Sequence, residues 1–186
     1  MSTPHEPLAA KLVCSAVAGD PDALWPQFGP ALEARFGPVE MIAPPRPFSF
    51  THYYDAEMGA GLTRRMLVFA RLVAQDTLRA VKLFTNSLEK KLARADGTRR
   101  LNLDPGILTQ ERMVLATGKN YTHRIYLGDG IFGDLTLVFQ AGSWQTLPWT
   151  FPDYASSEML ALFTDIRRRY RRDLRENAPA RPPATT

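Results

Sequence analysis

Cysteine is nearly absent from this chain, because Cys14 is the single one among 186 residues. One cysteine excludes an internal disulfide and a metal site built from several thiolates. It also agrees with a reducing compartment, where structural disulfides are rare. Cys14 lies within an apolar run, and we interpret it as an inert buried side chain. We therefore expect a cytoplasmic protein.

Long apolar runs are missing as well. None approaches the roughly 20 residues that a membrane helix needs, so we expect neither a membrane-spanning segment nor a membrane partner. Residues 15–18 imitate a signal-peptidase site, but no basic stretch precedes them and Lys11 interrupts the apolar stretch. We interpret this segment as part of the folded domain.

Three widespread catalytic motifs are missing from the structural context that each requires. It has no Gly-x-x-x-x-Gly-Lys-Ser/Thr loop, no Gly-x-Gly-x-x-Gly at the start of a helix and no Gly-x-Ser-x-Gly turn. These absences exclude the standard P-loop, Rossmann and α/β-hydrolase sites. A catalytic site would have to come from residues that lie far apart in the chain.

The net charge of +4 is local. Residues 160–186 hold seven arginines and three acidic residues, which accounts for all of it, and residues 1–159 balance. A solvated helix face is the simplest interpretation, since cations suit a helix C-terminus. The alternative is a non-enzymatic module that binds RNA or a protein through this arginine-rich helix, although RNA is not favoured.

Composition and turn signals indicate one α+β domain. Apolar residues make up 45% of the chain, which is enough for a single core at this length. We expect the domain to span residues 1–176 and residues 177–186, rich in Ala and Pro, to form a disordered tail. The patterns predict helices near 77–94 and 156–175, and strands near 12–17, 48–54, 64–72, 99–103, 111–117, 121–127 and 131–140.

Two parts of the chain echo each other. Phe50-Thr51-His52 recurs as Tyr121-Thr122-His123, and Leu67-Val68-Phe69 recurs as Leu137-Val138-Phe139. The echo predicts two related β-α-β-β-like units that form a mostly antiparallel sheet with helices packed on one face, ferredoxin-like in kind. Chance matches of three residues are the alternative to a duplication.

The best-defined hairpin joins 121–127 to 131–140. A three-residue Gly128-Asp129-Gly130 loop places Arg124 opposite Asp134, whereas a two-residue loop would mix the polar and apolar faces. We expect a cross-strand ion pair, which could also orient the Arg124 guanidinium toward a phosphate. The neighbouring His123 is either a satisfied core histidine or a catalytic group.

The strongest local candidate is the segment from Asn102 to Gly106. Pro105 fixes one turn dihedral and Gly106 tolerates positive φ, so we predict a tight turn after a strand. Strand alternation points Asn102 and Asp104 to the same side. Either Asp104 bonds only its own turn amides, or Asn102 and Asp104 present an amide and a carboxylate at a cleft.

Ionisable groups also gather before a glycine loop, from His52 to Glu57. Tyr54 and Glu57 are candidates for ligand binding and acid–base work, and a metal site of His52, Asp55 and Glu57 is a less favoured alternative. A rim of hydrogen-bonding aromatic residues is the simplest interpretation.

The predicted helix at 77–94 carries Lys82, Asn86 and Glu89 at the border of its apolar stripe. Asparagine has poor helix propensity, so Asn86 in mid-helix needs a reason. It either contacts Lys82 in an ordinary boundary stripe or faces a ligand.

Four segments in this order resemble an uncharacterised prokaryotic family, the domain of unknown function numbered 4416. The resemblance spans about residues 10–175 and implies no established activity, so it assigns no catalytic role to any residue. The four segments are Phe50-Thr51-His52-Tyr53-Tyr54-Asp55-Ala56-Glu57-Met58-Gly59, Asn102-Leu103-Asp104-Pro105-Gly106, His123-Arg124-Ile125-Tyr126-Leu127 and Pro148-Trp149-Thr150-Phe151-Pro152-Asp153-Tyr154.

Together these patterns predict a polar cleft that binds or processes a phosphorylated small molecule or a nucleotide. Lys82 and Arg124 would hold the anion, and Asn102 would orient the ligand. The sequence does not identify a cofactor, and we expect no metal ligands in the site. The candidate catalytic residues are Asp104, Glu57 and His123, and the candidate ligand-binding residues are Tyr54, Lys82, Asn86, Asn102 and Arg124.

Overall fold

A computed structural model describes residues 1–50 and 54–176 of the chain. The helices are α1 (Pro21–Phe36), α2 (Asp55–Met58), α3 (Leu78–Lys91) and α4 (Ser157–Glu176), with a short 3-10 turn, η1 (Gln75–Thr77), before α3. The strands are β1 (Ala10–Ala18), β2 (Val39–Ile42), β3 (Arg46–Pro47), β4 (Thr63–Val73), β5 (Asn102–Leu108), β6 (Arg112–Thr117), β7 (Arg124–Gly128), β8 (Ile131–Gln140) and β9 (Ser143–Thr146).

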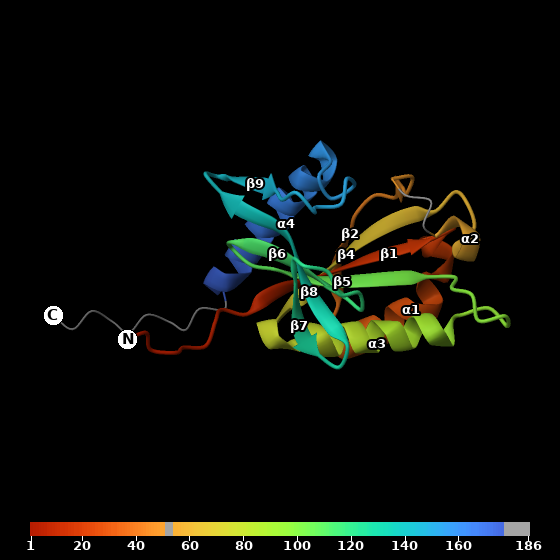
Figure 1. Ribbon diagram of the computed structural model, residues 1–186, viewed down its shortest axis with the longest axis horizontal. Coiled ribbons are helices and arrows are strands. Elements are labelled where there is room, and N and C mark those ends of the chain that lie inside the picture. Colours follow the sequence, from red (N-terminus) through yellow and green to blue (C-terminus); the bar gives the residue numbers. More distant parts are fainter. Residues whose placement is uncertain (51–53, 177–186) are drawn as a thin grey trace.

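All nine strands belong to one open sheet, and every neighbouring pair is antiparallel (Figure 1). The order is β2-β4-β1-β5-β6-β8-β7, while β3 also pairs with β4 and β9 with β8. Strands β1 and β2 are therefore parallel to each other and flank β4. Strands β4 and β5 are likewise parallel to each other and flank β1. Helix α1 connects the first of these pairs and α3 connects the second. The predicted α+β class and mostly antiparallel sheet are confirmed.

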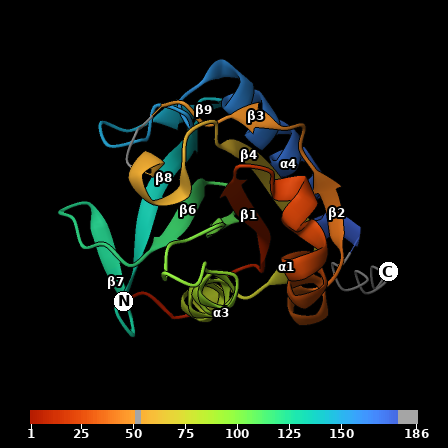
Figure 2. The same ribbon diagram turned by 90° about the vertical axis from the view of Figure 1, so that its right-hand side faces the viewer.

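Helices cover both faces of the sheet, so the prediction that they share one face is wrong. Strand β1 is buried at every position. Leu12 and Cys14 pack with α1 and α3, whereas Val13 packs with Phe163 and Ile166 of α4. Figure 2 shows α1 and α3 on one side of β1 and α4 on the other. A central strand that is apolar on both sides requires cover on both sides.

The predicted turn at Asp104-Pro105-Gly106 is also wrong, because this segment lies within β5. Strand β5 pairs with β1 from Asn102 onward, but it pairs with β6 only from Gly106 to Leu108. Pro105 lies on the stretch that lacks a β6 partner, and a missing N–H is tolerated at such an edge. The chain instead turns after Leu108, where the Thr109 N–H donates to the Arg112 carbonyl at 2.9 Å.

Gly106 is needed for close approach between strands. A Cβ at this position would lie 2.8 Å from the Val114 carbonyl oxygen and 2.8 Å from Leu115 Cδ2. The start of the β5–β6 ladder therefore depends on a residue without a side chain.

The predicted hairpin is confirmed at its central pairs. Arg124 faces Asp134 and Tyr126 faces Phe132, and a register shift follows between Tyr126 and Gly128. This shift makes Leu127 an extra residue on β7 and pairs Gly128 with Ile131. The loop therefore consists of Asp129 and Gly130 alone, and the predicted three-residue loop is wrong.

Part of the predicted strand at 48–54 is not a strand. Residues 48–50 have no strand structure and Tyr54 immediately precedes α2, while Thr51 to Tyr53 lie outside the described residues. The predicted tail at 177–186 lies outside them as well. Among the residues that the structure describes, no helix combines the length and apolar character that a membrane crossing demands.

Candidate functional site

The candidate site begins at the stretch of β5 that lacks a strand partner on its β6 side. The Leu103 N–H donates to Glu89 Oε1 at 2.7 Å, and Lys82 Nζ donates to the Leu103 carbonyl at 2.7 Å. Backbone groups in a strand must find partners when they are buried. Two side chains of α3 therefore take the place of a neighbouring strand.

The same lysine binds the Asp104 carboxylate. Lys82 Nζ lies 3.1 Å from Asp104 Oδ1 and 3.8 Å from Glu89 Oε1. The Lys82 side chain is only 7% exposed, whereas Asp104 keeps 33% of its side chain exposed. A buried cation thus joins a buried carboxylate, Glu89, to a partly exposed one, Asp104.

Burial and pairing set the protonation of these three groups. Burial acts to lower the pKa of Lys82, but the Asp104 and Glu89 carboxylates outweigh it and raise that pKa. Burial acts to raise the pKa of Asp104, but Lys82 and Asn102 outweigh it and lower that pKa. Burial raises the pKa of Glu89 above its ordinary value despite the nearby Lys82. At neutral pH Asp104 is therefore an ionised acceptor and not a proton donor.

A line of contacts leads from Asp104 to α2. Asn102 Nδ2 donates to Asp104 Oδ2 at 2.6 Å, and Arg99 Nη1 donates to Asn102 Oδ1 at 2.8 Å. Arg99 also binds both oxygens of Glu57, at 2.8 and 2.6 Å, and its guanidinium lies 5.3 Å from the centre of the Tyr54 ring. The hydrogen bonds from Arg99 lower the pKa of Glu57. Five sequence-predicted residues, Tyr54, Glu57, Lys82, Asn102 and Asp104, are thereby joined in one network.

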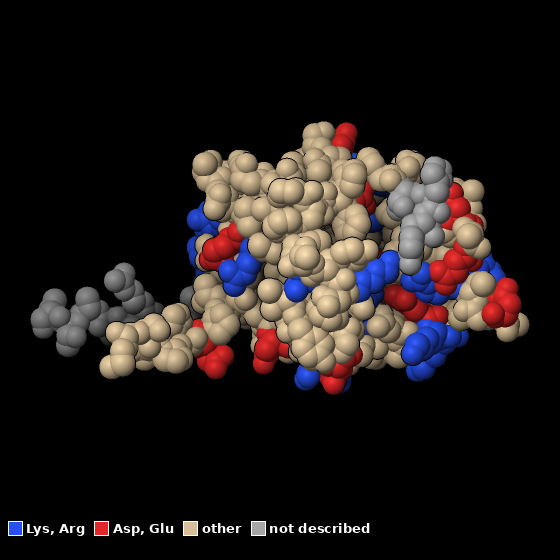
Figure 3. Space-filling view, viewed as in Figure 1, with Lys and Arg blue, Asp and Glu red and all other residues tan. Residues whose placement is uncertain are grey.

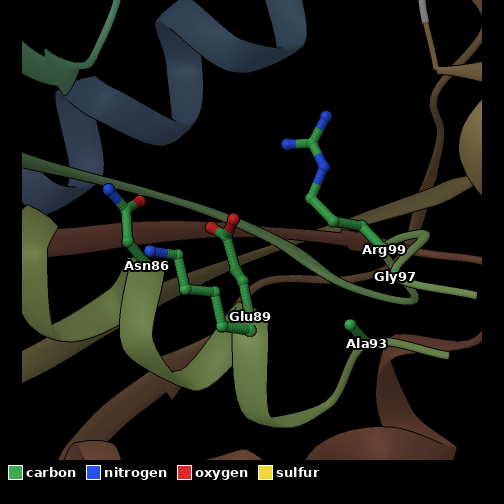
Figure 4. Close-up of a pocket in the computed structure, with 6 residues that line it drawn as sticks. Asn86, Glu89, Ala93, Gly97 and Arg99 are labelled. Carbon is green, nitrogen blue, oxygen red and sulfur yellow. The ribbon is translucent and has the colours of Figure 1, made fainter. Parts of the chain in front are cut away.

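A hollow of about 360 Å³ adjoins this network, and its lining residues are Asn86, Glu89, Lys90, Ala93, Gly97 and Arg99. Figure 4 shows Asn86 and Glu89 on α3 and Arg99 beyond them on the loop that follows the helix. Within the described part of the chain, no hydrogen bond or ion pair occupies the Asn86 amide or the Lys90 ammonium group. The predicted ligand-binding Asn86 is therefore beside the network and has free hydrogen-bonding capacity.

His123 and Arg124 belong to a second group of polar residues. Arg124 Nε donates to Asp134 Oδ2 at 2.7 Å, which confirms the predicted ion pair, and His123 Nε2 lies 3.3 Å from the same oxygen. The His123 ring stacks on Trp149 with centroids 4.9 Å apart. Strands β6 and β8 lie between β5 and β7, and three strand spacings amount to roughly 14 Å along a flat sheet. The structure thus divides the eight predicted residues into two groups.

The connector before α4, residues 148–156, is held against β4 by contacts with Arg64. The Arg64 guanidinium lies between the rings of Phe48 and Tyr154, 4.7 and 4.8 Å from their centroids, and pairs with Asp153. Tyr154 in turn stacks on Phe163 of α4 at 5.8 Å. Burial raises the pKa of Tyr154, so its hydroxyl stays protonated. These residues anchor the connector, and sequence reasoning identified Asp153 and Tyr154 only as part of a segment.

Metal ligands do not gather in the described part of the chain. No group of three or more His, Cys, Asp or Glu side chains there could hold a metal ion. The Glu57 carboxylate, one of the three ligands considered, is bound to Arg99. His52, another of them, lies outside the described residues.

Three arginines of α4, namely Arg167, Arg168 and Arg172, have local partners. Arg167 lies over the Phe139 ring at 3.5 Å and donates to the Gln110 carbonyl at 2.8 Å. Arg168 pairs with Asp165 at 3.2 Å. The solvated-face interpretation of the arginine run, and its alternative of an RNA- or protein-binding helix, both stay predictions.

Comparison with known proteins bears on the chain as a whole. No curated protein and no solved structure matches it significantly. The sequence profile of one family, a domain of unknown function named DUF4416, matches residues 8–170. Because the match covers almost the whole domain, the chain belongs to the DUF4416 family.

Proposed function

We propose that this protein binds a small phosphorylated molecule in the hollow beside α3. The observation that carries the proposal is the free Asn86 amide and free Lys90 ammonium group facing the same hollow as the Arg99 guanidinium. The volume of about 360 Å³ falls within the range typical of small-molecule sites. A nucleotide or a sugar phosphate would combine the anionic and hydrogen-bonding groups that these side chains recognise.

The charge distribution supports placing the phosphate near Lys90 and Arg99. Lys82, Arg64 and Arg124 are each bound to a carboxylate inside the protein. Lys90 is exposed and has no such partner among the described residues. Arg99 is paired with Glu57 but keeps part of its side chain at the surface. The predicted anion-binding role therefore moves from Lys82 and Arg124 to Lys90 and Arg99, and Asn86 keeps its ligand-binding role.

If the molecule is also processed, Asp104 is the group that we propose for the proton transfer. It is ionised at neutral pH, partly exposed and fixed by Lys82 and Asn102, so it can accept a proton, although its lowered pKa makes it a weak base. Asp104 does not line the hollow itself and adjoins it through the Lys82 and Glu89 side chains. Glu57 holds Arg99 in place through two hydrogen bonds and is better suited to positioning.

We also propose that β1, α1, β2, β4, α3 and β5 form a ferredoxin-like core, to which β6 to β9 and α4 are added. The order of these four strands and the placement of α1 and α3 on one face support this description. We also propose that the protein is cytoplasmic, because a single free cysteine suits a reducing compartment.

Binding can be measured by isothermal titration calorimetry and thermal shift with inorganic phosphate, nucleotides and sugar phosphates. Lys90→Glu should weaken binding at least about tenfold, equivalent to about 1.4 kcal/mol. Lys91→Glu is the matched control, because Lys91 is exposed on the same helix but does not line the hollow. The proposal fails if none of these probes binds, or if both variants weaken binding equally.

A further inference from the structure

Strand β7 is an edge strand whose residues remain exposed on both of its faces. It is the last strand in the sheet order, and within residues 1–50 and 54–176 it pairs only with β8. Three consecutive large side chains are exposed there: Ile125 by 70%, Tyr126 by 61% and Leu127 by 37%. An exposed edge leaves every second backbone N–H and C=O without a strand partner. Figure 3 shows this hairpin region, in the middle of the view, largely without charged atoms.

Edge strands are commonly protected by lysine, proline or an inward-pointing charge. Strand β7 contains neither lysine nor proline, and the charge of its Arg124 is matched by Asp134. Its bulge at Leu127 comes at the end of the strand and leaves the preceding residues regular. The edge is therefore open to another strand, and its apolar side chains favour a partner that is apolar as well.

We propose that β7 pairs with β7 of a second copy of this chain, antiparallel and across a two-fold axis at Tyr126. In this register Ile125 of each copy faces Leu127 of the other, and the two Tyr126 rings face each other. The pairing joins the two sheets into one continuous sheet.

Two properties of the strand favour a second copy over another partner. First, Ile125 and Leu127 lie on the same face of the sheet. Gly133 is paired with Ile125, so a Cβ on Gly133 would point to the same face as the Ile125 side chain, and this Cβ would lie 3.5 Å from Leu127 Cδ1. The strand therefore presents the same apolar pair to itself in the antiparallel direction. The second property is that β7 brings no unmatched charge to the edge, since Arg124 is bound to Asp134 and Asp129 of the loop is bound to Arg79, so two copies can pair without opposing like charges.

The available area agrees with a dimer. Large aromatic side chains bury about 150–250 Å² each. Tyr126 on the strand is 61% exposed, and Tyr121 and Trp149, which both stack on the His123 ring, are 58% and 37% exposed. Together with Ile125 and Leu127 they offer on the order of 500 Å² of apolar surface per copy. The strand backbone and neighbouring polar groups bring the total toward the ~800 Å² per partner of a standard interface.

Sedimentation velocity on the full chain over a concentration series tests this pairing. The wild type should form a concentration-dependent dimer, and Ile125→Lys should raise the dimer dissociation constant at least about tenfold. Ile42→Lys is the matched control, because Ile42 is 42% exposed and belongs to β2, the strand at the opposite edge of the sheet. A wild type that stays monomeric, or an Ile125→Lys dimer of unchanged affinity, overturns the proposal.

A charge exchange tests the register. Leu127→Glu alone should also dissociate the dimer. Combining Ile125→Lys with Leu127→Glu places the introduced lysine of each copy opposite the introduced glutamate of the other, and should restore it. The restored dimer should weaken as salt is added, because exposed ion pairs are screened. Circular dichroism must show native melting for each variant. Folded single variants that dissociate, together with a double variant that remains monomeric, contradict the pairing.

Discussion

Lys82→Met tests whether α3 replaces the missing strand beside β5. The substitution keeps an apolar side chain of similar length but removes the ammonium group. The Leu103 carbonyl then loses the donor that lies 2.7 Å from it, and Glu89 loses the cation 3.8 Å away. Asp104 is a third exposed and can regain water. The main loss therefore falls on the buried carbonyl and on Glu89.

Removing one partner of a buried ion pair costs about 3–5 kcal/mol. Two effects reduce this loss of stability. Asp104 regains hydration, and the protein no longer has to desolvate the Lys82 charge. We therefore expect a loss of about 3 kcal/mol, near the lower end of that range. At about 2–4 °C per kcal/mol for a chain of this size, the melting temperature should fall by about 6–12 °C.

Urea denaturation and calorimetry of Lys82→Met can be compared with Lys90→Met, an exposed position on the same helix. Adding Glu89→Gln to Lys82→Met removes the unpaired buried charge and should recover about 1–2 kcal/mol, since hydrogen bonds to a neutral amide remain available. A loss below about 1 kcal/mol for Lys82→Met, or no recovery in the double variant, would refute this account of the β5 edge.

Three further predictions concern residues around the same strand. The folded pKa of Asp104 is lowered, so its stabilising contribution is present above the ordinary pKa and is lost as pH falls through the folded pKa. In urea denaturation, the difference in unfolding free energy between wild type and Asp104→Asn should therefore shrink from pH 7 to pH 3. A constant difference would be inconsistent with the pairing. Gly106→Ala should destabilise the protein by about 1–3 kcal/mol, because the added Cβ meets the β6 backbone. In the control Gly118→Ala the added Cβ has no atom within 4 Å, so the melting temperature should change little. Equal effects of the two substitutions would argue against a close approach of β6 at Gly106. Cys14 should resist thiol reagents in the native protein and react in urea, because it is 2% exposed and burial raises the pKa of its thiol; rapid native labelling would contradict this placement.

Local pairing rules predicted the β7–β8 hairpin well. The separation of polar and apolar faces and the opposite charges of Arg124 and Asp134 favoured the observed alignment of these two residues. The predicted three-residue loop was wrong, because a bulge at Leu127 and a two-residue loop produce the same alignment. Alternation likewise predicted that Asn102 and Asp104 share a side, and they are hydrogen-bonded in the structure. These relations depend on residues within one hairpin or one strand, so the sequence contains the necessary information.

The turn predicted at Pro105 and Gly106 failed for a reason that local rules do not include. Proline and glycine indicate a turn when a segment is considered alone. Here Pro105 lies where β5 has no β6 partner, and Gly106 lies where β6 approaches closely. Both requirements come from the pairing of β5 with a neighbouring strand, which a segment considered alone does not reveal.

The candidate site was predicted in part for the same reason. Lys82, Asn102 and Asp104 meet as expected, but Arg99, which joins Asn102 to Glu57, lies in a loop without periodicity and stands beside a second arginine. Nothing in the sequence distinguishes these two arginines. Helices on both faces could have been inferred from β1, whose apolar run does not alternate.

The central claim is that the hollow beside α3 holds a phosphorylated ligand. Backbone amide chemical-shift mapping by NMR, with inorganic phosphate and a nucleotide as probes, tests it most directly. The account predicts saturable shifts confined to residues 86–93 and 97–99, which include the lining residues of the hollow, and their loss in Lys90→Glu. Shifts confined to the arginines of α4, or no saturable shift with any phosphorylated probe, would contradict it.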